Sequence, residues 1–171
     1  DIGANIGIFT MAVKLKAPEA TVYAFEPIPD TFHVLEQNVR LLECSDVYLY
    51  NVAVGSQDHV KEAFTFFPNM PGNSTAIPAL KDDQNPVMEH IFGKETSDFL
   101  HQSEPRTAQV RTLSSIIREQ GITSVDYLKI DVEGGEISVL DGIEEMHWPI
   151  FKQIAVETHT AQLQEQVCEV L

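Results

Sequence analysis

Apolar residues along the chain follow two spacings that alternate. The run Val22–Phe25 is apolar at consecutive positions, which is typical of a buried strand. Farther along, Phe32, Leu35, Val39 and Leu42 recur at intervals of three and four, as on one face of a helix. In chain order the pattern predicts a helix over about 6–16, a strand over 21–25, a helix after Pro29-Asp30, strands over 47–54, 61–67 and 107–111, a helix over 112–121, a strand over 125–130, a helix closing near 142, a strand over 153–156 and a helix from 161.

The order of these elements indicates a fold class. Strands that alternate with helices are joined by crossovers and form a parallel sheet with helices on both faces. The chain is therefore predicted to be α/β, with a doubly wound, Rossmann-like sheet. Its 171 residues suffice for one sizeable core, so we expect a single domain over residues 1–171.

Residues 56–109 interrupt the alternation. Beyond the strand over 61–67, this stretch is rich in proline, aspartate and histidine and shows no regular spacing. A long insertion in a small domain is usually functional or mobile. It is therefore interpreted either as a cap over the pocket of a second molecule or as a disordered surface loop. As a cap it offers Asn73 and Ser74 as candidates to contact that molecule.

Composition and charge narrow the possible partners. A hydrophobic fraction of 43% with 22% charged residues is typical of a globular soluble protein. The net charge of −15 argues against a nucleic acid and an anionic membrane as partners, and favours a small neutral or cationic ligand. No apolar run reaches the length of a membrane span. Cys44 and Cys168 match no metal or redox spacing, and two such cysteines suggest a cytoplasmic protein.

The first seven residues read D-I-G-A-N-I-G and precede the first predicted helix. Gly3 and Gly7 lack a Cβ atom and Asn5 tolerates a positive φ, so a ligand can approach the backbone at this turn. The helix N-terminus favours an anionic group, and Asp1 offers a carboxylate to an amine or hydroxyl. Glu26 ends the next strand, about 20 residues on, where nucleotide-binding units place an acid for the ribose hydroxyls. The alternatives are an ordinary turn and a solvated strand end.

The spacing D-x-G-x-N-x-G differs from the G-x-G-x-x-G of dinucleotide enzymes. With its acidic start, it resembles the S-adenosylmethionine-dependent methyltransferases, and among them the FkbM family. Asn5 stands where the general methyltransferase motif has glycine, as is usual in the FkbM-like branch. The resemblance runs nearly from end to end and rests on six segments in the family's order: DIGANIG at 1–7, AFEP at 24–27, NVAVG at 51–55, VRTL at 110–113, KIDVEGGE at 129–136 and ETH at 157–159.

The resemblance implies a class I methyltransferase sheet and S-adenosylmethionine as cofactor. Such a sheet has a strand before the glycine turn and a closing hairpin after the last helix, so the domain is expected to be truncated at both ends. The implied reaction is O-methylation of a small molecule, on a polyketide-like or sugar-like hydroxyl. The residues implied for the cofactor are Asp1, Gly3, Asn5, Gly7 and Glu26, with Ala53 and Val54 beside the adenine, unless the latter only precede a simple turn.

Acidic residues and one histidine follow the last predicted strands. Ligands of doubly wound sheets bind beyond the carboxyl ends of the strands, so we expect Asp131, Glu133, Glu157 and His159 at one edge. Such an edge suits a cationic sulfonium. A hydroxyl acceptor needs a base, and His159 is the first candidate, before Asp131 and Glu133, unless it only packs at the rim. These side chains could instead bind magnesium or manganese, which we do not favour without a tight ligand spacing. Lys129 is expected to form a structural ion pair.

Two further classes of function remain open. A nicotinamide oxidoreductase uses the same kind of sheet but is disfavoured by the missing glycine motif. A domain of a larger synthase could also retain this fold without activity. For the favoured methyltransferase the expected partner is a small-molecule acceptor, without nucleic acid or membrane, and the chain could belong to a larger multidomain protein.

Overall fold

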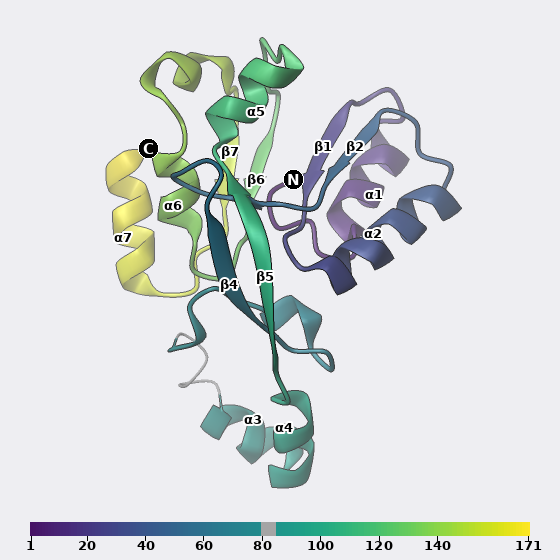
Figure 1. Ribbon diagram of the computed structural model, residues 1–171, viewed down its shortest axis with the longest axis vertical. Coiled ribbons are helices and arrows are strands. Elements are labelled where there is room, and N and C mark those ends of the chain that lie inside the picture. The colour runs from purple at the N-terminus through teal and green to yellow at the C-terminus, as the bar shows by residue number, and fades with distance from the viewer. Residues whose placement is uncertain (80–84) are drawn as a thin grey trace.

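Parallel strands meet at the N-terminal segment of the chain. The computed structural model describes residues 1–79 and 85–171. In it β1 (Val22–Phe25) pairs in parallel with β2 (Val47–Tyr50), and β6 (Leu128–Ile130) pairs in parallel with β7 (Ile154–Val156). Ile2 forms parallel bridges to the last residue of both β1 and β6, so it joins the two pairs. The N-terminus accordingly lies between them in Figure 1. The order is β2, β1, Ile2, β6, β7, and the fold is mixed α/β.

Strand β1 is buried on both faces. Its Ala24 packs with Leu35 and Val39 of α2 (Pro29–Leu41), while Phe25 belongs to a second apolar cluster. Successive side chains of a strand point to opposite faces, so the two clusters lie on opposite sides. The elements that supply or adjoin the larger cluster are α5 (Leu113–Gln120), α6 (Glu136–Asp141) and α7 (Ala161–Val170), and α1 (Ile8–Lys16) lies beside α2 (Figure 1).

The strand predicted over 47–54 is divided between two sheets. The first part is β2, and the second, β3 (Ala53–Val54), pairs in parallel with β5 (Glu104–Arg111). Between them Nδ2 of Asn51 donates to the carbonyl oxygens of Glu26 (2.9 Å) and Pro27 (3.1 Å). The prediction of one strand is therefore wrong, because this side chain holds the backbone in a bend.

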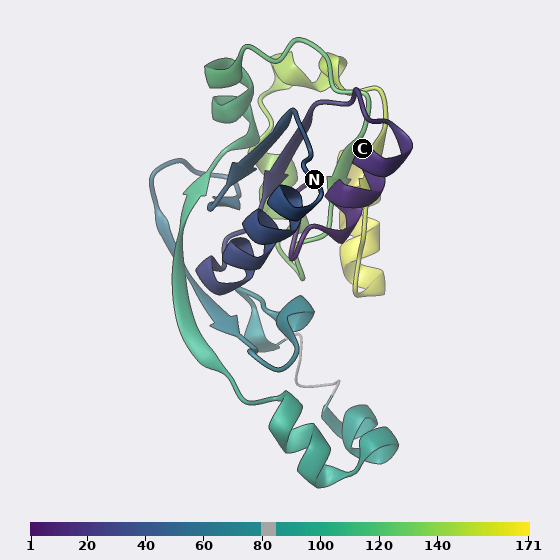
Figure 2. The ribbon, with the colours of Figure 1, turned by 90° about the vertical axis from the view of Figure 1, so that its right-hand side faces the viewer.

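The insertion contains regular elements that the sequence pattern did not predict. Strand β4 (Lys61–Phe66) was expected, and it pairs antiparallel with β5. The short helix η1 (Pro71–Asn73) and the helices α3 (Asn85–Phe92) and α4 (Lys94–Leu100) were not. Figures 1 and 2 show α3 and α4 as a helical pair at the far end of β5, away from the other helices. Both are short, and α3 exposes Ile91 and Phe92, so no continuous buried face marks them in the sequence.

The other elements agree with the sequence analysis to within a few residues. Thr112 caps α5 by accepting a hydrogen bond from the Ser115 N–H (3.1 Å), and Gly121 ends the helix with φ 62°. Strand β6 is shorter than expected, although Val125 forms an isolated bridge to Phe151. A 3-10 helix, η3 (Glu145–Ile150), precedes β7. In residues 1–79 and 85–171 no helix has the length and apolar character needed to cross a membrane.

Candidate active site

A cavity of about 580 Å³ opens where Ile2, β1 and β6 end. Its walls come from the glycine turn, the loop after β6, strand β3 and the part of the insertion around η1. Segments far apart in the sequence therefore meet at the carboxyl edge of the parallel strands, as predicted. The predicted site residues that line the cavity are Gly3, Asn5, Glu26, Ala53, Val54, Ser74, Asp131 and Glu133.

Four predicted residues are not part of this lining: Asp1, Gly7, Asn73 and His159. The side chain of Asp1 is 0% exposed and points into the protein. Its Oδ2 accepts a hydrogen bond from Oγ1 of Thr10 (2.6 Å), and its Oδ1 lies 3.5 Å from Nζ of Lys129. Asp1 therefore anchors the glycine turn to the first helix and to β6.

The backbone of the glycine turn is left-handed at three residues, with φ 77° at Gly3, 50° at Asn5 and 90° at Gly7. A Cβ atom on Gly3 would lie 1.7 Å from the carbonyl oxygen of Asp131, and one on Gly7 2.5 Å from Cδ1 of Leu35. At position 3 glycine is thus required by a contact with backbone, a cause that sequence reasoning missed. At position 7 the near atom is the end of a leucine side chain, so the positive φ is the stronger constraint.

The turn also uses its own amide groups. The N–H of Gly3 donates to the carbonyl oxygen of Phe25 (3.1 Å), and the N–H of Gly7 donates to that of Ala4 (2.8 Å). These two donors are engaged within the protein, so they are not free for a ligand in the cavity. The anionic group predicted at the N-terminus of the first helix concerns the N–H groups that follow Gly7, and it stays a prediction.

Glu26 is a buried carboxylic acid in the cavity wall, with 6% of its surface exposed. Oε2 accepts a hydrogen bond from the N–H of Asn5 (3.0 Å), and Oε1 accepts one from the N–H of Ile28 (2.9 Å). Burial raises the pKa of Glu26 to about 7, because a charged carboxylate loses its water there, while the two N–H groups act in the opposite direction. Each oxygen keeps a second lone pair for another donor.

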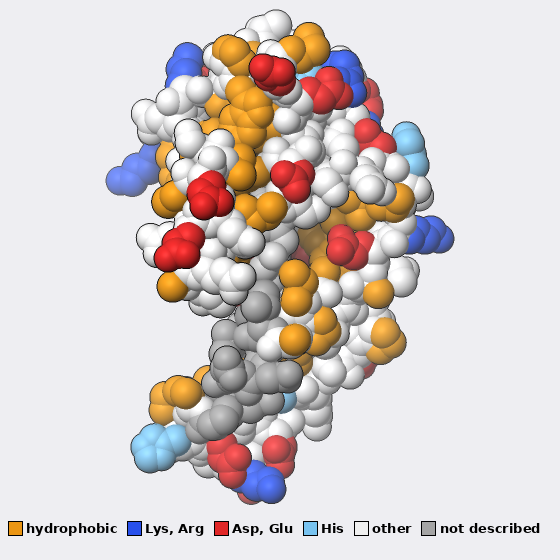
Figure 3. Space-filling model, turned by 90° about the vertical axis from the view of Figure 1, so that its left-hand side faces the viewer, with side chains coloured by type: hydrophobic (Ala, Val, Ile, Leu, Met, Phe, Trp, Pro, Cys, Tyr) orange, Lys and Arg blue, Asp and Glu red, His pale blue; other side chains and the backbone are white. Residues whose placement is uncertain are grey.

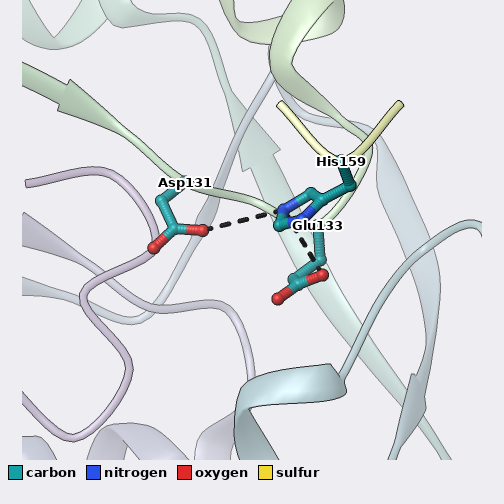
Figure 4. Close-up of side chains that lie close together, drawn as sticks. All are labelled: Asp131, Glu133 and His159. Carbon is teal, nitrogen blue, oxygen red and sulfur yellow. Dashed lines mark ion pairs between the residues drawn. The ribbon is translucent and has the colours of Figure 1, made fainter. Parts of the chain in front are cut away.

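Asp131, Glu133 and His159 form a cluster at the edge of the cavity (Figure 4). Nε2 of His159 lies 3.4 Å from Oε2 of Glu133 and 4.0 Å from Oδ1 of Asp131. The other oxygen of Asp131 lies 3.0 Å from Nζ of Lys129, the ion pair that the sequence predicted. The structure thus brings together all three predicted catalytic candidates, with His159 beside the two acids that line the cavity.

The loop that carries Glu133 is held from two sides. Glu133 has φ 55°, a left-handed conformation that is uncommon for a residue with a side chain. Its carbonyl oxygen accepts a hydrogen bond from Oγ1 of Thr75 (2.7 Å), and the next N–H, of Gly134, donates to Oε1 of Glu136 (3.1 Å). Thr75 and Glu136 are both fully buried. Sequence reasoning missed both, although an acid directly after two glycines, in the first helical turn, could have drawn attention to Glu136.

The charged side chains that line the cavity are all acidic. Of the described residues that line it, none is lysine, arginine or histidine. Acidic side chains are also scattered over the face in Figure 3. A recess lined by one sign of charge concentrates the field and attracts the opposite charge. The acids of the lining are Glu26, Glu62, Asp131, Glu133, Asp141 and Glu157.

Known proteins give the context for this site. Methyltransferase sdnD of Sordaria araneosa is 37% identical over 92% of the chain, which covers 64% of that relative. The 31-O-demethyl-FK506 methyltransferase FkbM of Streptomyces tacrolimicus is 33% identical over 93% of the chain, covering 64% of that protein. AMB antimetabolite synthetase AmbE of Pseudomonas aeruginosa is 28% identical over 93% of the chain, which covers only 8% of it.

The chain thus spans 64% of the length of the first and second of these relatives. No solved structure matches it significantly. The family model of the methyltransferase FkbM domain matches residues 1–170, which is nearly the whole chain. The resemblance found in the sequence motifs is thereby confirmed: the chain belongs to the FkbM family of methyltransferases.

Proposed function

We propose that this domain binds S-adenosylmethionine and transfers its methyl group to a hydroxyl oxygen of a small molecule. Oxygen as the acceptor atom is supported by the name of the Streptomyces relative, a 31-O-demethyl-FK506 methyltransferase. A polyketide-like acceptor is the first choice on the same ground, and a sugar-like one the second. The order β2, β1, Ile2, β6, β7, with apolar clusters on both faces of β1, supports a doubly wound, Rossmann-like sheet.

The observation that carries the proposal is the acidic cavity at the carboxyl edge. Its volume of about 580 Å³ is within the usual size of a small-molecule site. Six carboxylates and no basic side chain among its described lining residues suit a ligand with a positive sulfonium and ammonium. The pyrophosphate of a nicotinamide cofactor is anionic, so the same wall would repel it. This disfavours the oxidoreductase alternative.

Individual residues fit parts of the donor. Glu26 has free lone pairs for ribose hydroxyls, and Ala53 and Val54 offer an apolar wall to an adenine ring. Gly3 and Asn5 line the cavity directly, whereas Asp1 and Gly7 act by holding the turn in shape. Ser74 lines the cavity, whereas Asn73 is not part of its lining. The position of Ser74 supports the part of the insertion around η1 as a wall of the acceptor pocket.

The reaction needs alignment and the loss of one proton. When bound, S-adenosylmethionine would supply an electrophilic methyl group, which would pass to the acceptor oxygen as the carbon–sulfur bond breaks and a thioether is left. The hydroxyl proton would have to be taken up by a side chain of the site or by water. Alignment in such a pocket contributes up to roughly 7–11 kcal/mol. We assign the binding of the hydroxyl and the removal of its proton to Asp131, Glu133 and His159, a task worth roughly 10²–10⁴-fold in rate.

Calorimetry with S-adenosylmethionine and with NAD tests the choice of cofactor. We expect binding of the first and none of the second. Glu26→Gln should weaken S-adenosylmethionine binding about tenfold, because the amide cannot accept from two hydroxyls and two N–H groups at once. Glu36→Gln, outside the cavity, is the control and should bind normally. Tight binding of NAD, or full affinity in Glu26→Gln, would contradict the proposal.

Transfer of a labelled methyl group to a panel of polyketide-like and sugar-like alcohols tests catalysis. Mass spectrometry of the product identifies the methylated atom. A protein that binds the donor but labels no acceptor would support the alternative of an inactive domain. The small part of AmbE that the chain matches supports a further expectation, that the domain is part of a multidomain protein.

A further inference from the structure

The cluster at the cavity edge combines two kinds of side chain from two places in the fold. Asp131 and Glu133 follow β6, and His159 follows β7 (Figure 4). One ligand-type atom of each side chain lies within 4.8 Å of the others. Carboxylate oxygen and imidazole nitrogen together are a ligand set for divalent first-row metals.

The distances in this cluster are too long for hydrogen bonds. A charge-assisted hydrogen bond between imidazole and carboxylate measures about 2.7–2.9 Å, whereas Nε2 of His159 lies 3.4 Å and 4.0 Å from the two carboxylates. Ligands placed about 2.1 Å from one octahedral ion are roughly 3.0 Å apart when adjacent and roughly 4.2 Å apart when opposite. Both observed distances fall between these limits.

An independent observation concerns the imidazole alone. Nε2 of His159 is buried and has no hydrogen-bond partner within residues 1–79 and 85–171, although it points toward the two acids. A buried polar atom without a partner is costly, and a bound ion is one way to satisfy it. The two carboxylate oxygens of the neighbouring Asp131 face different groups. Oδ2 pairs with Lys129, and Oδ1 faces His159.

We infer that Asp131, Glu133 and His159 form a binding site for one divalent cation of the manganese type. The site adjoins the cavity, because Asp131 and Glu133 also line it. The inference deepens the proposed function and rests on it for the purpose of the ion: a cation there lowers the pKa of a hydroxyl placed against it, so the proton can pass to water. His159 then serves as a ligand, through its neutral imidazole, and not as the base.

Binding of Mn²⁺ added as its chloride, without any methyl donor, tests the site. Electron paramagnetic resonance distinguishes free from bound Mn²⁺, and salt of about 0.15 M suppresses loose binding to an acidic surface. We expect one tight site per chain. Glu133→Gln and His159→Gln should each raise its Kd at least about tenfold, which is 1.4 kcal/mol.

A matched control comes from a second histidine–carboxylate pair. Nδ1 of His33 lies 3.8 Å from Oε2 of Glu36 on an exposed helix face, and neither residue lines the cavity. His33→Gln should therefore leave Mn²⁺ binding unchanged. A Kd that rises equally in His33→Gln and His159→Gln would show adventitious binding and overturn the inference. So would the absence of a tight site in the unaltered protein.

The outcome for the metal is separable from that for the methyl donor. Failure to bind Mn²⁺, with normal binding of S-adenosylmethionine, removes the metal site and returns His159 to the role of base. Binding of Mn²⁺ without binding of S-adenosylmethionine leaves the site intact and contradicts the proposed function. When both bind, stimulation of methyl transfer by Mn²⁺ that is lost in Glu133→Gln supports the role given to the ion.

Discussion

Glu26 shows how burial changes the chemistry of one residue. The sequence placed it at the end of a strand. Of its two backbone hydrogen bonds, the one from Ile28 is local, whereas the one from Asn5 comes from the glycine turn, and the side chain is buried there. Its pKa, raised to about 7, means that the folded protein holds this proton more strongly than the unfolded chain does. Ionising this side chain in the cavity wall therefore costs stability.

The stability of the protein without ligand should reflect this cost. Below pH 4.5, the pKa of Glu26 in the unfolded chain, its raised pKa makes the full contribution to the free energy of unfolding. This contribution is lost as the pH rises to about 7. Over that window Glu26 should account for a fall of roughly 3 kcal/mol in the free energy of unfolding.

Urea unfolding of the unaltered protein and of Glu26→Gln at pH 5 and pH 8 measures the difference. The unaltered protein should lose more stability between the two values than the variant does. Identical pH dependence in both proteins would show that Glu26 ionises as it does in water.

Neighbouring backbone atoms leave no room for a side chain at Gly3. In Gly3→Ala the new Cβ atom would clash with the carbonyl oxygen of Asp131, and the alanine would have to adopt φ 77°. We expect a loss of at least about 3 kcal/mol in the free energy of unfolding. Gly121 is the matched control, since its φ is 62° but no described atom lies within 4 Å of its Cβ position. Gly121→Ala should cost only about 1 kcal/mol, for the left-handed backbone alone. Equal losses in the two variants would contradict the steric explanation.

At the scale of elements, the insertion is joined to the sheet edge by Thr75. Its backbone pairs in both directions with Thr65 in β4 (2.9 and 3.1 Å), and its hydroxyl donates to Glu133. The adjoining Gly72 is close to Asn5, because its Cβ position is 3.4 Å from Nδ2 of that residue. One short segment therefore contacts both the glycine turn and the loop of the acid cluster.

Thr75→Val should remove this link without changing the shape of the side chain. The Glu133 carbonyl would lose the hydrogen bond from Thr75, and we expect kcat to fall about tenfold while the Kd of the methyl donor changes little. Thr75→Ser keeps a hydroxyl and should restore most of the activity. Thr31→Val is the control, since Thr31 is buried but its hydroxyl has no hydrogen-bond partner among the described residues. A parallel loss of donor affinity in Thr75→Val would point to general destabilisation instead.

The elements also show where periodicity is informative. Helix α5 agrees with its pattern at both ends, because the Thr112 cap and Gly121 act locally. The boundary between β2 and β3 was missed, since it depends on Asn51 reaching residues that are distant in sequence. Helices α3 and α4 were missed because short helices with exposed apolar residues lack a one-sided spacing.

At the scale of the whole molecule, the net charge of −15 and the acidic cavity both attract a positively charged ligand. S-adenosylmethionine carries one more positive charge than S-adenosylhomocysteine, the product of transfer. Salt should therefore weaken binding of the first more than that of the second. Between 50 and 500 mM sodium chloride we expect about a threefold loss for S-adenosylmethionine and a smaller one for the product. Calorimetry at both concentrations measures this, and equal salt dependence would exclude a role for the acids.

The sequence by itself determined the order of most strands and helices, the family, and the identity of the candidate site residues, because these depend on local spacing and short motifs. Tertiary structure alone decided which of those residues face the cavity, why Gly3 must be glycine, and that Thr75 and Glu136 hold Glu133. These features depend on contacts between segments distant in the chain: only folding brings Thr75 to Glu133 or the Gly3 position to Asp131.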